Sequence, residues 1–192
     1  MRSEFWKKLW KTKIPNKAKV HAWRVCLDIL PSMGSLVAKR VPLDSTLCVL
    51  CEKEGESTLH LSRDCEFSKR VIQNNPILKS ICYRWSMVHD STIEWLNHCA
   101  KELSLAHFGE LLFLLWSVWK ERNDRVWNQK NSCSLDVSIA AAVMLNAFRL
   151  HNSVQDSKMK VPRIIQWKAP PTSFLKINVD GAFNHVTKLG DS

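Results

Sequence analysis

The sequence predicts a mainly α-helical protein with a single β-strand near its C-terminal end, and three observations support this fold class. Apolar residues recur every three or four positions along most of the chain, which is typical of amphipathic helices. Four metal-binding side chains lie within eighteen residues, at Cys48, Cys51, His60 and Cys65. Near the end of the sequence the apolar spacing changes to every second residue, which is typical of a strand. We therefore expect a zinc-stapled helical domain, a helical connector and an isolated strand.

The N-terminal helices are predicted from apolar spacing and from the residues that interrupt it. An apolar stripe predicts a short helix over residues 4–11, which Pro15 separates from the next helix. Asn16 is a suitable N-cap for a second helix over residues 17–30. Pro31 ends that helix, and a third is expected over residues 32–40.

The middle of the chain continues with the same helical spacing after a metal-binding module at residues 44–66. Helices are expected over residues 62–73, 77–103, 105–128 and 134–155. Ser91 is a suitable N-cap within the second of these ranges. Residues 120–125 are charged, and we expect them to form the solvent-facing end of an otherwise buried helix.

The C-terminal part differs in composition and in period. A polar linker is expected over residues 157–166, and Leu175, Ile177 and Val179 alternate with polar residues, which predicts a strand over 174–180. One strand cannot fold alone, so this part is expected to be the first edge of a larger domain. The predicted division of the chain is 1–75, 76–156, 157–166 and 167–192.

The cysteine and histidine spacing predicts one zinc site. Two cysteines separated by two residues can offer both thiolates from one tight turn, and a polar loop containing Gly55 separates them from the second pair of ligands. His60 and Cys65 would face the same ion if their segment is helical. Four protein ligands leave no open position for a catalytic water, so the ion is expected to be structural. The alternative is that these are ordinary reduced cysteines beside a surface histidine.

Composition limits the class of protein and its compartment. The chain has 192 residues, of which 45% are hydrophobic and 24% charged, as in globular proteins. Four of the seven cysteines lie outside the zinc pattern and form no regular framework, which favours a reducing compartment, nuclear or cytoplasmic. The longest apolar run, residues 111–119, is far shorter than the roughly 20 residues of a membrane span. We therefore expect no membrane association and no secretory signal.

The positive charge is concentrated at the N-terminus. The net charge is +10, and the first 45 residues hold ten basic against three acidic side chains. Such a patch attracts phosphates without regard to sequence. The candidate nucleic-acid-binding residues are Lys7, Lys8, Lys11, Lys13, Lys17, Lys19 and Arg24. Two alternatives stay open, a solvated face that only maintains solubility and a protein-binding surface in which tryptophans act as anchors.

Three segments resemble the proteins of plant non-LTR retrotransposons. Residues 5–31, together with the Cys48, Cys51, His60 and Cys65 pattern, are similar to the zinc-binding domain of their reverse transcriptases, with Glu56 in the place of an acidic residue that precedes the histidine. Residues 116–123 resemble the helix that follows this domain. Residues 167–182 resemble the opening strand of a plant ribonuclease H-like domain.

This resemblance implies a function and also its limits. It makes Asp180 the first of the carboxylates that hold two divalent metals, usually Mg²⁺, in a complete ribonuclease H domain. The other carboxylates have no counterpart here, so we expect a non-catalytic, zinc-binding and nucleic-acid-binding fragment of a retrotransposon-derived polyprotein. One alternative is a zinc-stabilised interaction module that docks on a reverse transcriptase domain. Another is a decaying gene fragment without a selected function.

Overall fold

A computed structural model describes residues 2–43, 45–83, 90–156, 170–174, 182–184 and 189–191. The chain divides into two units, Met1–Ser157 and Lys158–Ser192. The first unit contains the helices α1 (Arg2–Lys11), α2 (Asn16–Cys26), α3 (Met33–Ala38), α4 (Glu66–Gln73), α5 (Pro76–Cys82), α6 (Thr92–Glu102), α7 (Leu105–Asn128) and α8 (Ser134–Asp156), with a π-helical turn η1 (His60–Asp64). The mainly helical class is therefore confirmed for the described residues of this unit.

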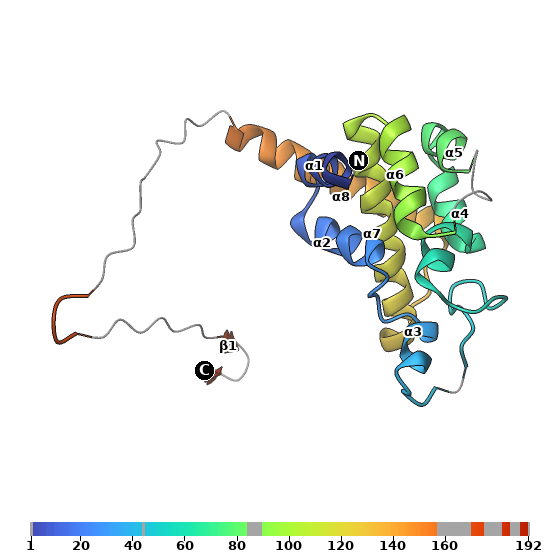
Figure 1. Cartoon of the computed structure of the whole chain (residues 1–192), viewed down its shortest axis with the longest axis horizontal. Coiled ribbons are helices and arrows are strands. Elements are labelled where there is room, and N and C mark those ends of the chain that lie inside the picture. The colour runs from blue at the N-terminus through green and yellow to red at the C-terminus, as the bar shows by residue number, and fades with distance from the viewer. Residues whose placement is uncertain are drawn as a thin grey trace. The chain divides into compact units, whose positions relative to one another are not determined.

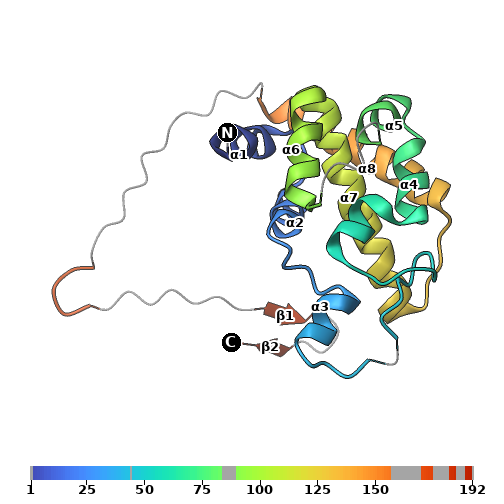
Figure 2. The ribbon, with the colours of Figure 1, turned by 45° about the vertical axis from the view of Figure 1, so that its right-hand side comes forward.

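Helix α7 is the centre of the first unit. It contacts α1, α2, α4, α5, α6, α8 and η1, and Figures 1 and 2 both show it running through the middle of the helical unit. Its apolar side chains are buried over most of its length, among them Phe108, Leu111 and Phe113. The Ser104 hydroxyl accepts a hydrogen bond from the His107 backbone at its start, and Gln129 ends it in the left-handed conformation. The prediction over 105–128 is confirmed.

The second helix is shorter than the predicted 17–30. Asp28 adopts the left-handed conformation with φ 53°, and the backbone N–H of Ile29 donates to the carbonyl of Arg24 at 3.1 Å. These contacts form a Schellman cap, which ends α2 four residues before the predicted end. The left-handed residue is an aspartate, whereas glycine is more usual at this position, so the sequence does not mark the helix end clearly. Asn16 is the first helical residue and Pro15 the N-cap, so the predicted capping role of Asn16 is wrong.

The single helix predicted over 62–73 is also wrong. Cys65 has an extended ψ of 128°, which separates η1 from α4. The weak pattern over 77–103 corresponds to two helices, α5 and α6. Pro76 occupies the first turn of α5, where its missing N–H costs nothing. The Ser91 hydroxyl accepts from the Glu94 backbone N–H at the start of α6, as predicted.

The second unit contains a short hairpin in its described part. The strands β1 (Ala182–Asn184) and β2 (Leu189–Asp191) pair antiparallel, with Phe183 opposite Gly190. The strand predicted over 174–180 lies outside the described residues apart from Phe174, so the isolated strand is not shown. The linker predicted over 157–166 lies outside them entirely. Among the described residues, no helix is long and apolar enough to cross a membrane.

Candidate metal centre

The four predicted ligands lie together in the structure. The ligand atoms of Cys48, Cys51, His60 and Cys65 all lie within 4.8 Å of one another. The two sulfurs of Cys48 and Cys65 are 3.8 Å apart, and the sulfur of Cys51 is 3.4 Å from Nε2 of His60. A tetrahedron with zinc–sulfur bonds of about 2.3 Å and zinc–nitrogen bonds of about 2.05 Å has edges of about 3.8 and 3.6 Å. The donor set and its spacing therefore fit one Zn²⁺.

A tight turn presents the first two cysteines. The backbone N–H of Cys48 donates to the carbonyl of Glu54, and the N–H of Glu52 donates to the carbonyl of Cys48 at 2.7 Å. Glu52 has a φ of 57°, which reverses the chain immediately after Cys51. Leu47 and Gly55 close the turn as an isolated antiparallel bridge. Because the chain turns here, Cys48 and Cys51 can present both thiolates to the same ion although only two residues separate them.

The π-helical turn brings His60 and Cys65 to the same ion. Five residues of α-helix would place the two side chains about 140° apart around the axis, which is too far for a shared ligand. In η1 the N–H of Cys65 instead donates to the carbonyl of His60 at 2.7 Å, an i to i+5 bond. Ser68 supports the wider turn by donating from its hydroxyl to the carbonyl of Leu61. His60 and Cys65 therefore lie where both could bind one ion, as predicted. The π-helical turn, and not the expected α-helix, brings them together.

The electrostatics of the centre favour a cation. A hydrogen bond from Cys48 lowers the pKa of Cys65 to about 3, and the Ser68 and Phe67 backbone N–H groups at the start of α4 act in the same direction. Hydrogen bonding to Cys65 raises the pKa of His60 to about 9. The same hydrogen bond raises the pKa of Cys48, so the two shifts place one negative charge, on the sulfur of Cys65, beside the His60 ring. The Glu54 carboxylate lies 3.2 Å from Nδ1 of His60 without hydrogen-bond alignment, where it can orient the ring for a metal at Nε2.

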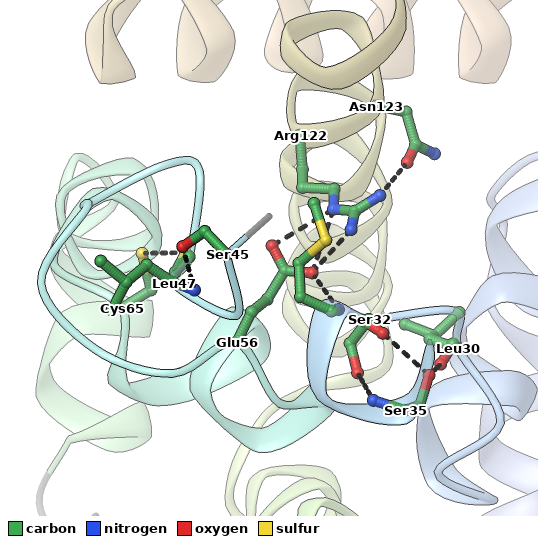
Figure 3. Close-up of polar contacts among 11 residues, drawn as sticks. Leu30, Ser32, Ser35, Ser45, Leu47, Glu56, Cys65, Arg122 and Asn123 are labelled. Atoms are coloured by element: carbon green, nitrogen blue, oxygen red, sulfur yellow. Dashed lines mark hydrogen bonds and ion pairs between the residues drawn. The ribbon is translucent and has the colours of Figure 1, made fainter. Parts of the chain in front are cut away.

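A buried ion pair joins the metal-binding loop to α7. Nη2 of Arg122 donates to Oε1 of Glu56 at 2.7 Å, and both side chains are almost completely buried. The same carboxylate oxygen accepts the backbone N–H of Met33 at 2.8 Å, where α3 begins, and Figure 3 shows the guanidinium and carboxylate facing each other. The Glu56 carbonyl accepts from Gly34, where an added Cβ would lie only 2.8 Å from that oxygen. The metal-binding loop, the start of α3 and α7 therefore meet at Glu56.

The prediction that residues 120–125 face solvent is wrong for Glu121 and Arg122, which are 5% and 2% exposed. Arg125 also turns toward the metal-binding loop, and its Nη1 donates to the carbonyls of Val49 and Leu50 at 3.4 and 3.5 Å. The only sequence signal for these contacts is a charged run that continues an apolar helix. Such a run does not identify its partners, which here lie 66 to 76 residues away.

The predicted nucleic-acid-binding residues divide into two groups in the structure. Exposed side chains belong to Lys7, Lys11, Lys13, Lys17 and Arg24, on α1, on α2 and between them. The ammonium of Lys8 instead donates to the carbonyls of Ala100 and Leu103 and caps the end of α6. The ammonium of Lys19 donates to the carbonyl of Trp10 at 2.9 Å. Lys8 and Lys19 therefore have structural partners. Asp180 lies outside the described residues.

Comparison with known proteins agrees with this geometry. A family model described as zinc-binding in reverse transcriptase matches residues 1–71, which include all four clustered ligands. Residues 1–71 are therefore similar to the zinc-binding domain of reverse transcriptases. The domain is completed by contacts outside the matched range, since Arg122 and Arg125 of α7 hold its metal-binding loop.

The similarity extends beyond the zinc-binding domain. In an alignment 188 residues long that covers 94% of the chain, the sequence is 23% identical to a putative ribonuclease H protein of Arabidopsis thaliana. The chain spans about 30% of the length of that relative. No solved structure matches the chain. The predicted resemblance to a retrotransposon reverse transcriptase zinc-binding domain followed by a ribonuclease H-like part is therefore confirmed.

Proposed function

We propose that the protein is a non-catalytic, retrotransposon-derived module that uses one structural zinc ion to hold a nucleic-acid-binding surface. The observation that carries this proposal is the group of five exposed basic side chains on α1, on α2 and in the connection between them, here called the basic face: Lys7, Lys11, Lys13, Lys17 and Arg24. Phosphate contacts of this kind do not depend on sequence. RNA, DNA and hybrid duplexes are therefore all candidate partners.

The donor set of the metal centre supports a structural ion. Cys48, Cys51, His60 and Cys65 supply four ligands, so zinc would have no open position for water. When bound, the ion would fix the ends of an eighteen-residue loop whose Glu56 then reaches α7. A Mg²⁺ site of the ribonuclease H type would require further carboxylates besides Asp180. A reducing compartment, nucleus or cytoplasm, would preserve the thiolates.

A salt titration of nucleic-acid binding tests this proposal. The triple variant Lys7→Gln, Lys11→Gln, Lys17→Gln removes three charges from the basic face. Each lost phosphate contact lowers the slope of log K against log salt by about 0.7 for a single strand, so the slope should fall by about 2. The matched control is Lys69→Gln, Lys79→Gln, Lys130→Gln, which removes the same charge from α4, α5 and the end of α7. Equal slopes for the two variants would contradict the proposal.

One observation favours a second candidate, a module that docks on a protein such as a reverse transcriptase domain. Leu135, Ile139, Val143 and Leu150 of α8 are 53–70% exposed. They are spaced four, four and seven residues apart, which places them along one side of the helix. Docking through this surface should persist as salt rises, whereas phosphate binding should weaken steeply.

A further inference from the structure

A cavity of about 630 Å³ opens between α2, α3 and the C-terminal half of α7. We call it the tryptophan groove, because Trp116, Trp119 and Trp127 line it from α7. Its volume lies within the range of small-ligand sites, roughly 300–1,000 Å³. It is separate from the metal centre, since its lining includes none of the four metal ligands.

His21 lines the groove and has no hydrogen-bond partner. Its side chain is buried, with 6% of the residue exposed, and neither Nδ1 nor Nε2 is hydrogen-bonded. Burial lowers its pKa to about 3, with a further contribution from Arg24, so the ring is neutral and offers one donor and one acceptor. Unpaired buried polar groups are rare and destabilising. A ligand that offers both a donor and an acceptor would satisfy them.

The remaining lining residues combine flat rings with positive charge. The centroid of the His21 ring lies 6.1 Å from that of Trp119, and the guanidinium carbon of Arg122 lies over the Trp119 ring at 5.0 Å from its centroid. Trp127 is 75% exposed at the edge of the groove, where a ring is free to stack. Lys17 and Arg24 contribute positive charge, and none of the described lining residues is acidic. Base stacking on aromatic rings beside cationic side chains is the usual chemistry of single-strand binding.

We propose that the tryptophan groove receives an unpaired base of a single-stranded nucleic acid, which stacks on Trp127 and hydrogen-bonds to His21 while Lys17 and Arg24 hold the flanking phosphates. The proposal rests on the proposed function and adds to it the class of ligand, since a duplex cannot present an unstacked base. Lys17 and Arg24 belong to the basic face as well, so the strand would pass from α1 and α2 directly into the groove.

Two 12-nucleotide probes test the proposal with the full chain: a thymidine oligomer and an abasic strand of the same length. Wild type should bind the thymidine oligomer about tenfold more tightly than the abasic strand, as expected for one stacked base. His21→Leu and Trp127→Ala should each reduce this preference to within about twofold, with binding of the abasic strand unchanged. Trp10→Ala, which removes an exposed tryptophan outside the groove, is the matched control.

The outcomes separate this proposal from the one on which it rests. If the affinity of wild type for the abasic strand does not fall as the salt concentration rises, the proposed function is refuted, and the groove assignment with it. Salt-sensitive binding with a base preference that His21→Leu and Trp127→Ala leave unchanged would refute the groove alone, as would an equal loss in Trp10→Ala. In that case a protein segment becomes the better occupant of the groove. The free energy of unfolding of His21→Leu, measured in urea, should equal or exceed that of wild type, because the substitution removes an unpaired buried group.

Discussion

Removing the Arg122 side chain should destabilise the protein strongly. In Arg122→Leu, the Glu56 carboxylate stays fully buried and keeps the Met33 N–H but loses every bond from the guanidinium. Breaking one partner of a buried ion pair costs about 3–5 kcal/mol, because the other charge is left without compensation. That is a large part of the 5–15 kcal/mol typical of whole domains. The Tm should fall by roughly 6–20 °C for a chain of this length.

Urea unfolding at a fixed, saturating zinc concentration measures this effect. Lys120→Leu is the matched control, because Lys120 lies on the same helix and pairs with Asp124 at 2.9 Å while 58% exposed. Exposed pairs contribute 0–1 kcal/mol, so the control should change the free energy of unfolding by at most about that amount. The double variant Glu56→Gln, Arg122→Leu should recover about 2 kcal/mol of the lost free energy of unfolding, since it removes the uncompensated buried charge. Equal effects in Arg122→Leu and Lys120→Leu would refute the reasoning.

Three further predictions concern the metal, a helix end and pH. Purified protein should carry one equivalent of zinc, and a chelator should reduce its helical circular dichroism signal. Cys65→Ser should lose the zinc, whereas the control Cys133→Ser, at an exposed cysteine, should keep it. Lys8→Met should lower the free energy of unfolding by about 2 kcal/mol through lost bonds to the α6 carbonyls, whereas Lys7→Met should change it by less than about 0.5 kcal/mol. The pKa of His21 falls from 6.5 to about 3 on folding, so the unfolded state binds the extra proton and stability declines as pH falls below 6.5. Between pH 7.5 and 5 wild type should lose about 2 kcal/mol more than His21→Leu in urea unfolding, and parallel curves would contradict this assignment.

The sequence predicts best those features that are set by nearby residues. The four metal ligands lie within eighteen residues, so their spacing alone identifies them. The long helices α7 and α8 match their predictions to within one residue, because many periodic positions support each of them. Element ends are less predictable: α2 ends at a Schellman cap that uses Asp28, a residue with only a weak preference for the left-handed conformation.

Contacts between distant segments could not be predicted. Glu56 and Arg122 are 66 residues apart, and each looks like a solvated charge within its own surroundings. The charge pattern likewise predicts that Lys8 and Lys19 are equivalent to their neighbours. Only the hydrogen bonds of Lys8 at the end of α6 and of Lys19 to the Trp10 carbonyl distinguish these two lysines from the exposed ones. The unpaired state of His21 is also invisible in the sequence, where it occupies an ordinary helical position.

The π-helical turn has an evolutionary consequence. Such a turn is equivalent to an α-helix into which one residue has been inserted. Deleting one residue between His60 and Cys65 would leave them four apart in a regular α-helix, where they still share a face. Inserting one would leave them six apart, about 120° around an α-helix, and the turn would have to accommodate a second extra residue to bring both side chains to one ion. Length variation among relatives should therefore be one-sided at this point, with single deletions accepted and single insertions eliminated.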